Sequence, residues 1–518
     1  MAILRLVYFN IFLIFTLVLS IFISTKVVAD DVFKADKLFV ANDYKGAALA
    51  YAEAASIGSP HAFYQLGAMN YKGLGMPVNK TKALVWFALA AEYHFSDAQN
   101  VVDNMLASLD EQTQQGILEK IQVAKQNTGK LAIEERFFPQ LNVALLDETV
   151  TFGGHATLDN KYTGSDFELG VFDQPFIFDG GGFDNGGFDE FSTIFDDDIT
   201  TSYLASGGLK NIDESDKLRR RLPFAIVDYD LGEDGSIRNL QTVQILGNPT
   251  TLIQRFVQTT LPPPAFQGKR VEFTNRTYLG IANFDRFGIK EQNKDFYFRV
   301  KRLARNLKKS DDLNDKFQYA MTLYNFPWLN QEEGEAKAVL AKVAAAGHPI
   351  AQYEYGLRLY RDQTNIAEAI DWLTQSSKYG YAKAQYQLAR VLHASPWVMN
   401  EEDKALYWYM SAANDGHKAA ALKAAELKLL AKDKRLINVS EAIALLDSIE
   451  DSQENNPEYN FLVAVSHKDR DNRDFTQVVG YMENAISLGE KYNWDVAYWE
   501  ALLELWRTGR VTVKDQPS

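Results

Sequence analysis

Several residue types that carry out chemistry are present, but none of them forms a recognised catalytic or metal-binding pattern. The chain has seven histidines and no cysteine, which excludes a thiolate nucleophile, a disulfide, an iron–sulfur cluster and a thiolate zinc site. His155, His393 and His467 have no partner at the spacing of metal ligands, and neither His-Glu-x-x-His nor Gly-x-Ser-x-Gly occurs. The other histidines are His61, His94, His348 and His417, which we expect at equivalent positions at the junctions of a sequence repeat, so that the repeat explains them. We therefore expect no enzyme, no cofactor and no metal.

Residues 147–198 are the one stretch that resembles a cation site in composition. They hold thirteen acidic side chains and a single basic one, Lys161, and a Gly-Gly-Phe-Asp sequence occurs twice. The candidate calcium ligands are Asp184, Asp189, Asp196, Asp197 and Asp198. Their spacing lacks the Asp-x-Asp-x-Asp-Gly pattern of a helix–loop–helix site, so a solvated acidic tether is the simpler interpretation and calcium binding is the alternative.

The charge of the chain argues against nucleic acid as a partner. Lys and Arg number 54 and Asp and Glu number 68, which gives a formal net charge of −14. A surface of this sign repels a phosphate backbone. The short basic run 217–221 is better explained as the solvated flank of the next strand than as a site for an anionic surface.

The length and composition indicate more than one folded unit. The chain has 518 residues, of which 46% are hydrophobic and 24% are charged. One hydrophobic core rarely organises so many residues, so we expect several domains or an extended array. The charged fraction excludes a protein with many membrane spans.

The first residues predict export from the cytoplasm. Arg5 precedes an apolar stretch, residues 6–25, and small side chains follow it up to Ala29. This is the pattern of a signal peptide with cleavage between Ala29 and Asp30. The alternative is an uncleaved anchor in the inner membrane, because the stretch is long enough to span a bilayer. The lack of cysteine favours a bacterial periplasm, where we expect the mature chain.

A repeat of two helices occurs near both ends of the chain. In its best copy, one helical pattern from Ala62 leads to the turn residues Gly73 and Gly75, and a second pattern starts after Asn79. The two glycines allow a positive φ, and the asparagine can cap the second helix. Similar sequences begin at Gly347, Gly380 and Gly416, at intervals of 33 and 36 residues. A period of this length with two helices per unit predicts an α-solenoid.

These sequences resemble the Sel-one-like repeats, which are related to the tetratricopeptide repeats. The resemblance rests on an alanine, a Leu-Gly pair, a Tyr-x-x-Gly-x-Gly turn, a Lys-Ala pair, an aromatic pair and an Ala-Ala pair, all of which occur between residues 62 and 94. In the C-terminal copies the turn lacks its two glycines, so those turns must differ. The resemblance implies a repeat array that binds protein partners.

The middle of the chain predicts a small α+β module. Phe224, Ile226 and Tyr229 mark a first strand, a Gly-Glu-Asp-Gly turn follows, and a second strand extends over 237–246. Asn248 and Pro249 start a helix that ends before three consecutive prolines, and a last strand extends over 271–284. The order is β-β-α-β.

This order resembles the TonB C-terminal domain, on the residues 234–237, 243–246, 264–266 and 268–271. The resemblance implies a sheet edge that takes one strand from an outer-membrane receptor or partner. A Tyr-Pro sequence before the first strand is missing, and a helical array follows a domain that usually ends its chain. We therefore expect a recognition domain and not a transmitter of force.

Together these patterns predict a multidomain protein with an α-solenoid at both ends and a small α+β domain in the middle. The expected parts are a signal peptide or anchor (1–29), N-terminal repeats (30–130), an acidic and partly irregular linker (131–210), the TonB-like domain (211–290) and C-terminal repeats (296–518). The expected function is a non-enzymatic scaffold of the bacterial envelope, in which both arrays offer concave surfaces to protein partners. The alternative is a TonB-type component of energised outer-membrane transport, anchored by its N-terminal helix. Partner, process and oligomeric state are not indicated.

The residues that we expect to build the repeats are small or aromatic and lie at the helix contacts and turns. They are Ala62, Leu66, Gly67, Gly73, Gly75, Ala83, Trp86, Gly347, Ala351, Trp372, Gly380, Ala384, Trp408 and Gly416.

Overall fold

A computed structural model describes residues 32–152, 223–246, 248–280, 286–292, 294–471 and 473–508. The chain divides into two compact units, Met1–Ile117 and Leu118–Ser518. The apolar N-terminal stretch, the expected cleavage site at Ala29 and Asp30, and the five candidate calcium ligands lie outside the described residues. Within the described ranges, no helix is both long and apolar enough to cross a membrane.

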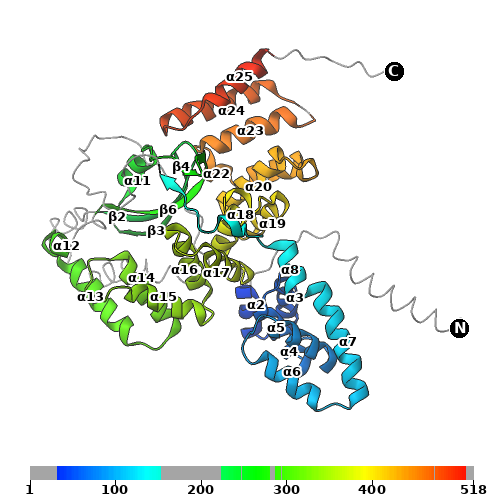
Figure 1. The fold of residues 1–518 in the computed structure, drawn as a ribbon. Helices are drawn as coiled ribbons and strands as arrows, with labels where there is room; N and C mark the ends of the chain where they lie inside the picture. The colour runs from blue at the N-terminus through cyan, green and yellow to red at the C-terminus, as the bar shows by residue number, and fades with distance from the viewer. Residues whose placement is uncertain are drawn as a thin grey trace, which may run out of the picture. The chain divides into compact units, whose positions relative to one another are not determined.

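The first unit is built of antiparallel helix pairs (Figure 1). Its helices are α2 (Val32–Val40), α3 (Tyr44–Ser56), α4 (Pro60–Lys72), α5 (Lys80–Ala91) and α6 (Ala98–Ala107), and α7 (Glu111–Thr128) begins in this unit. The pair α4–α5 forms where the sequence predicts it. Ser59 caps α4 through its hydroxyl, which accepts from the amide of Ala62, and Asn79 caps α5 in the same way. Gly73 ends α4 in the left-handed conformation, as predicted.

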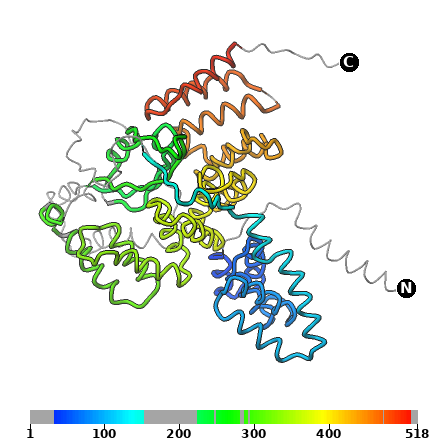
Figure 2. The backbone as a smooth tube through the Cα atoms, viewed as in Figure 1, coloured from blue at the N-terminus to red at the C-terminus, as the bar shows by residue number. Residues whose placement is uncertain are grey.

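The second unit contains the longer array, whose helices also run in antiparallel pairs (Figure 2). They are α12 (Arg286–Gln292), α13 (Lys294–Lys309), α14 (Leu313–Asn325), α15 (Glu335–Ala345), α16 (Pro349–Asp362), α17 (Ile366–Lys378), α18 (Ala382–Ala394), α19 (Glu402–Asn414), α20 (Lys418–Leu430), α21 (Val439–Asp447), α22 (Glu450–Gln453), α23 (Pro457–Asp469), α24 (Phe475–Lys491) and α25 (Ala497–Thr508), with the short 3-10 turn η4 (Lys434–Leu436). The turns differ from the double-glycine turn, as expected: Gln363 ends α16 with a positive φ, and Ser395 ends α18 with extended backbone.

The second unit also holds the β-β-α-β module. Its elements are β2 (Phe224–Leu231), β3 (Ile237–Leu246), α11 (Thr250–Val257) and β6 (Phe273–Gly280). These strands form an antiparallel sheet of order β3-β2-β6, called the central sheet below. Asp228 pairs with Gln241 of β3 on one side and with Arg276 of β6 on the other. A second three-stranded sheet has the order β1-β4-β5, from β1 (Thr151–Phe152), β4 (Pro264–Phe266) and β5 (Lys269–Arg270).

Residues 130–152, most of which we expected in the linker, are part of the folded second unit. They form α8 (Lys130–Phe137), the 3-10 turn η2 (Val143–Leu145) and β1, and they pack on the C-terminal repeats. The indole of Trp408 donates to the carbonyl of Phe137 at 2.7 Å, and that of Trp397 donates to the carbonyl of Glu148 at 2.9 Å. This segment therefore covers α18 and α19 instead of linking two domains freely.

Candidate functional site

The central sheet has one face that combines apolar and acidic side chains. Side chains alternate along a strand, so Phe224, Ile226, Asp228 and Asp230 share one face of β2. All eight residues of β2 are nevertheless buried. The two carboxylates are only 9% and 5% exposed. Buried carboxylates need compensating charges, and the C-terminal repeats supply them.

Arg276 is the first of these compensating groups. It projects from β6 and binds Asp228 with two hydrogen bonds, of 2.7 Å from Nε and 2.9 Å from Nη2. The same guanidinium reaches Glu354 of α16 at 3.0 Å, and Arg361 of α16 donates to Asp228 at 3.0 Å. Burial alone would raise the pKa of Asp228, but Arg276 and Arg361 outweigh it and hold this pKa at about 2. Asp228 is therefore a permanent anion that links the sheet to α16.

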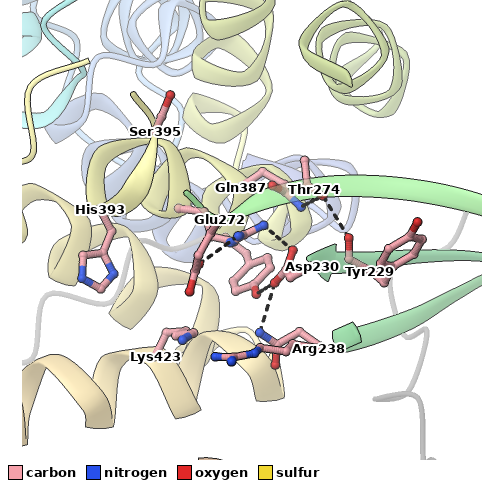
Figure 3. A network of polar contacts seen from close by, with 12 residues as sticks. Tyr229, Asp230, Arg238, Glu272, Thr274, Gln387, His393, Ser395 and Lys423 are labelled. Carbon is pink, nitrogen blue, oxygen red and sulfur yellow. Dashed lines mark hydrogen bonds and ion pairs between the residues drawn. The ribbon is translucent and has the colours of Figure 1, made fainter. Parts of the chain in front are cut away.

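A second cluster surrounds Asp230, one pleat further along β2 (Figure 3). Arg390 of α18 forms an ion pair with Asp230, and Tyr386 of the same helix donates to it at 2.5 Å. The other end of the Arg390 guanidinium binds Glu272, just before β6, at 3.0 Å. Against the opposing effect of burial, Lys423 and Arg390 lower the pKa of Glu272 to about 2. The sheet is thus joined to α18 by charges as well.

The contacts continue to the last repeats. Lys423 of α20 projects into the space below Glu272 (Figure 3) and pairs with Glu458 of α23 at 2.6 Å. Further along, Arg238 of β3 lies 4.4 Å from the ring centre of Trp494, in the loop between α24 and α25. Buried charged and aromatic residues therefore connect the central sheet with the C-terminal array at several points, from α16 to the loop between α24 and α25.

The repeat itself determines which helix residues meet the sheet. One position, seven residues after the junction glycine of each repeat, is buried. It holds Glu354, Gln387 and Lys423, which are 5%, 6% and 5% exposed. Glu354 contacts Arg276, and Gln387 lies 3.4 Å from Thr274 of β6. We call the side of each first helix that carries this position the inner face. In α16 and α18 the inner face is filled by the central sheet, whereas Lys423 on α20 pairs with Glu426 and Glu458. The open concave surface that we expected for the C-terminal array is therefore wrong for α16 and α18.

The first unit has the same position without such a cover. Gly58 precedes α4 as Gly347 precedes α16, so Gln65 corresponds to Glu354. Gln65 and its neighbours Tyr64 and Ala68 are half-buried, and one turn further Tyr71 is 45% exposed. Tyr64 is partly covered by the next helices, since its hydroxyl donates to Asp97 at 2.7 Å and its ring packs on Phe87. The described residues 32–117 contain no strand that could lie against Gln65 as the central sheet lies against Glu354. The inner face of α4 therefore corresponds to the face that the central sheet covers in α16 and α18.

The predicted repeat residues divide into close-contact positions, turn positions and aromatic positions. Ala62, Ala83, Ala351 and Ala384 are 0% exposed, and Leu66 is 3% exposed. A side chain added at Gly67 would meet the ring of Phe87 at 2.9 Å. Gly73, Gly75, Gly347, Gly380 and Gly416 all have a positive φ, between 71° and 92°. Trp408 is 0% exposed, whereas Trp86 and Trp372 are half-buried. The structure brings them together only as helix contacts within repeats.

The repeat histidines fall into two groups, which corrects the expectation that all four are equivalent. His348 and His417 are N-caps, whose Nδ1 atoms accept from the amides of Ala351 and Ala420 at 3.1 and 3.2 Å. The cap of α4 is Ser59. His61 instead lies two residues later and contacts Asp36 at 2.9 Å, and His94 lies in the turn after α5 with a positive φ.

Three kinds of site bear on whether the described residues carry out chemistry: a metal-binding group, a groove and a cluster of ionisable side chains. Among them, no group of three or more His, Asp or Glu side chains is placed to hold a metal ion. A groove of about 330 Å³ between α24 and α25 is lined largely by glutamates, including Glu483, Glu490, Glu500 and Glu504. The buried clusters around Asp228 and Asp230 are closed by arginines on several sides.

Three segments of the chain are similar to a known repeat. The Sel1 repeat matches residues 60–92, 349–381 and 382–417, which are the helix pairs α4–α5, α16–α17 and α18–α19. The chain contains three Sel1 repeats. Proteins with Sel1 repeats typically mediate protein–protein interactions.

Individual similar proteins match less. A curated F-box protein from Arabidopsis thaliana is 36% identical over 67 residues, which is 13% of this chain and 19% of that protein. The crystal structure of a protective antigen of uropathogenic Escherichia coli strains, with an SLR fold, has a TM-score of 0.31 at 15% identity, covering 88% of this chain and 68% of that chain. A Sel1 repeat protein from Oxalobacter formigenes has a TM-score of 0.30 at 18% identity, covering 40% of this chain and 57% of that chain.

Proposed function

We propose that the protein is a non-enzymatic interaction scaffold that binds a protein partner on the inner face of its N-terminal Sel1 repeat, residues 60–92. The single observation that carries this proposal is the difference between the two arrays. In α16 and α18 the inner face is buried by the central sheet, while in α4 the corresponding Gln65 is only half-buried. The C-terminal array shows what such a face holds when it is filled: strands that present side chains to successive first helices.

The residues of the inner face of α4 indicate what kind of ligand it holds. At the position that is acidic in α16, neutral in α18 and basic in α20, α4 has the neutral Gln65. Near the end of α4, Tyr71 and Lys72 are exposed and add an aromatic ring and a positive charge. We therefore expect an extended segment of a partner, bound by amide hydrogen bonds and aromatic contact, with an acidic residue toward Lys72.

Site-specific photo-crosslinking tests the proposed face. A photoreactive phenylalanine analogue replaces Gln65 in the full-length chain, and the matched control carries it at Leu49, which is 70% exposed on the second helix α3. In cells of the source organism, we expect one adduct of defined mass from position 65 and none from position 49. Equal adducts from both positions, or none from either, would contradict the proposal.

The compartment belongs to the same proposal. The apolar stretch 6–25 and the following small residues support export to the periplasm. N-terminal sequencing of the fractionated protein tests this. A soluble chain that begins at Asp30 is expected, and it would eliminate the alternative of an anchored TonB-type transport component. An intact N-terminus in the cytoplasmic fraction would refute export.

The central sheet supports a second, narrower role. Within the described part of the chain, β3 and β6 each pair only with β2, so each has one edge without a strand partner. The resemblance to the TonB C-terminal domain would place a partner strand at such an edge, held by main-chain hydrogen bonds. Ile245, near the end of β3, is 48% exposed. Protection of the β3 amides from hydrogen exchange when an envelope peptide is added would support this role, and unchanged exchange with all such peptides would refute it.

A further inference from the structure

Helix α13 has two sharply different sides. At about 100° per residue, Phe296, Val300, Ala304 and Leu307 form one stripe, and each is at most 8% exposed. This stripe packs in the core with Phe224 and Phe326. The apolar side of the helix is therefore already used by the fold, and the opposite side faces outward.

The outward side is basic. Lys294, Lys301, Arg302, Arg305 and Lys309 fall within roughly 100° of the helix circumference. Four of these side chains are exposed, and Lys301 is half-buried beside Tyr297. From Arg286 to Lys309 the chain has nine basic and two acidic residues, in a protein of net charge −14.

Within the described ranges, most of these cations have no acidic partner. Lys294, Arg302, Arg305 and Lys309 form no ion pair with any residue in the described ranges, in contrast to Lys308, which pairs with Glu335 at 2.6 Å. Phe298 lies between Lys294 and Arg302 on the same side and is 43% exposed. Phe287 on the preceding helix α12 is 78% exposed. Figure 1 shows α12 and α13 at the outer edge of the second unit.

We propose that the basic side of α13 docks on an anionic phospholipid surface. Several unpaired cations along one helix give the electrostatic attraction that such a surface exerts on Lys and Arg. The exposed phenylalanines give an apolar contact at the headgroup level. The occupant is a lipid surface, because the exposed cations and the exposed Phe298 lie along one side of a single helix, where charge and ring can meet a flat interface together. The net charge of the whole chain disfavours nucleic acid.

This proposal is independent of the partner site on α4, because it uses another helix in the other unit. Docking through α13 would hold the second unit with the long axis of α13 along the membrane plane. Attraction of this kind acts over about one Debye length, roughly 8 Å at physiological salt. It is therefore expected to be reversible and sensitive to salt.

Vesicle sedimentation tests the proposal. The chain from Asp30, which keeps every described residue, is mixed with vesicles of phosphatidylcholine alone or of phosphatidylcholine with phosphatidylglycerol. We expect at least tenfold more bound protein on the anionic vesicles at low salt, and most of this binding should disappear in high salt. The test variant is Arg302→Glu with Arg305→Glu, and the matched control is Lys432→Glu with Arg435→Glu, two exposed residues whose replacement changes the net charge equally.

The double variant on α13 should lose at least tenfold in bound fraction, while the control should lose less than twofold. Phe298→Ser should weaken binding several-fold and leave the circular dichroism spectrum unchanged. Equal binding to both vesicle types, or equal losses in the α13 variant and the control, would overturn the proposal. Retention on an immobilised polyglutamate without vesicle binding would also overturn it, because the basic side would then recognise an acidic polypeptide.

Discussion

Replacing Arg276 tests whether the central sheet is truly buried on the inner face of the C-terminal array. Arg276→Met keeps most of the side-chain volume and removes the guanidinium. Glu354 would then lose Arg276, its ion-pair partner, while 5% exposed. Asp228 would keep Arg361 but lose its two-point contact with Arg276. Breaking a buried ion pair in this way costs about 3–5 kcal/mol, because an uncompensated charge stays in the interior.

The matched control is Lys308→Met. Lys308 pairs with Glu335 at 2.6 Å, a distance similar to that between Arg276 and Asp228, but its side chain is 58% exposed. Exposed pairs contribute about 0–1 kcal/mol, so the two variants should differ by at least about 2 kcal/mol. The double variant Arg276→Met with Glu354→Leu should recover part of the loss, since it removes the stranded charge along with its partner.

Urea unfolding of the full-length chain measures these differences through tryptophan fluorescence. Seven of the eight tryptophans lie in the second unit, the exception being Trp86, so the signal reports mainly on the unit that contains the network. A loss within about 1 kcal/mol of the control would mean that water reaches Arg276. The docking of the sheet on the repeats would then be wrong.

Three further predictions follow from single residues. Gly67→Leu should lower the stability of the first unit by about 2 kcal/mol in calorimetry, because the new side chain meets the Phe87 ring, whereas Gly116→Leu, with nothing within 4 Å, should be neutral or stabilising. Burial lowers the pKa of His393 to about 4. As the pH falls, His393 is therefore protonated in the unfolded chain before it is protonated in the folded one. About 2–3 kcal/mol of stability should therefore be present above pH 6.5 and be lost as the pH falls toward 4. If the urea midpoint of His393→Gln falls as steeply with pH as that of the unchanged protein, this reasoning is refuted. Finally, His417→Ala should cost about 1 kcal/mol by removing the cap of α20, and an unchanged midpoint would show that the cap contributes nothing.

The repeats could be predicted because their determinants are local. The turn at Gly73 and the cap at Asn79 act within a few residues of themselves, and the small side chains at Gly67 and Ala83 are needed wherever two helices approach closely. The β-β-α-β order was also readable from turn and proline positions. The resemblance of that module to a TonB domain stays a hypothesis.

What covers each repeat face could not be predicted, since it depends on residues far apart in the sequence. Asp228 and Asp230 alternate with Tyr229 as they would on a strand with a solvated face, and only the burial of all of β2 reveals their role. Their partners Arg361 and Arg390 lie more than a hundred residues later. One available signal was missed, namely the dense basic pattern of α13, which is visible in the sequence.

The charges between sheet and array also determine how the strand lies in the groove. Asp228 and Asp230 are two residues apart, so both point toward the repeats. There they form ion pairs with Arg361 of α16 and Arg390 of α18, which are successive first helices of the repeats. A slip of one residue would turn both carboxylates toward the apolar side covered by α11 and would leave both arginines buried without a counter-charge. Only one register avoids that penalty. On α4, Gln65 lies at the position of Glu354, and Lys72 lies at the position of Arg361, fourteen residues after the junction glycine, so Lys72 is the charge that can select the register of a bound segment there. A partner on that face must be specified by its own shape and by Tyr71 and Lys72 at the end of the helix.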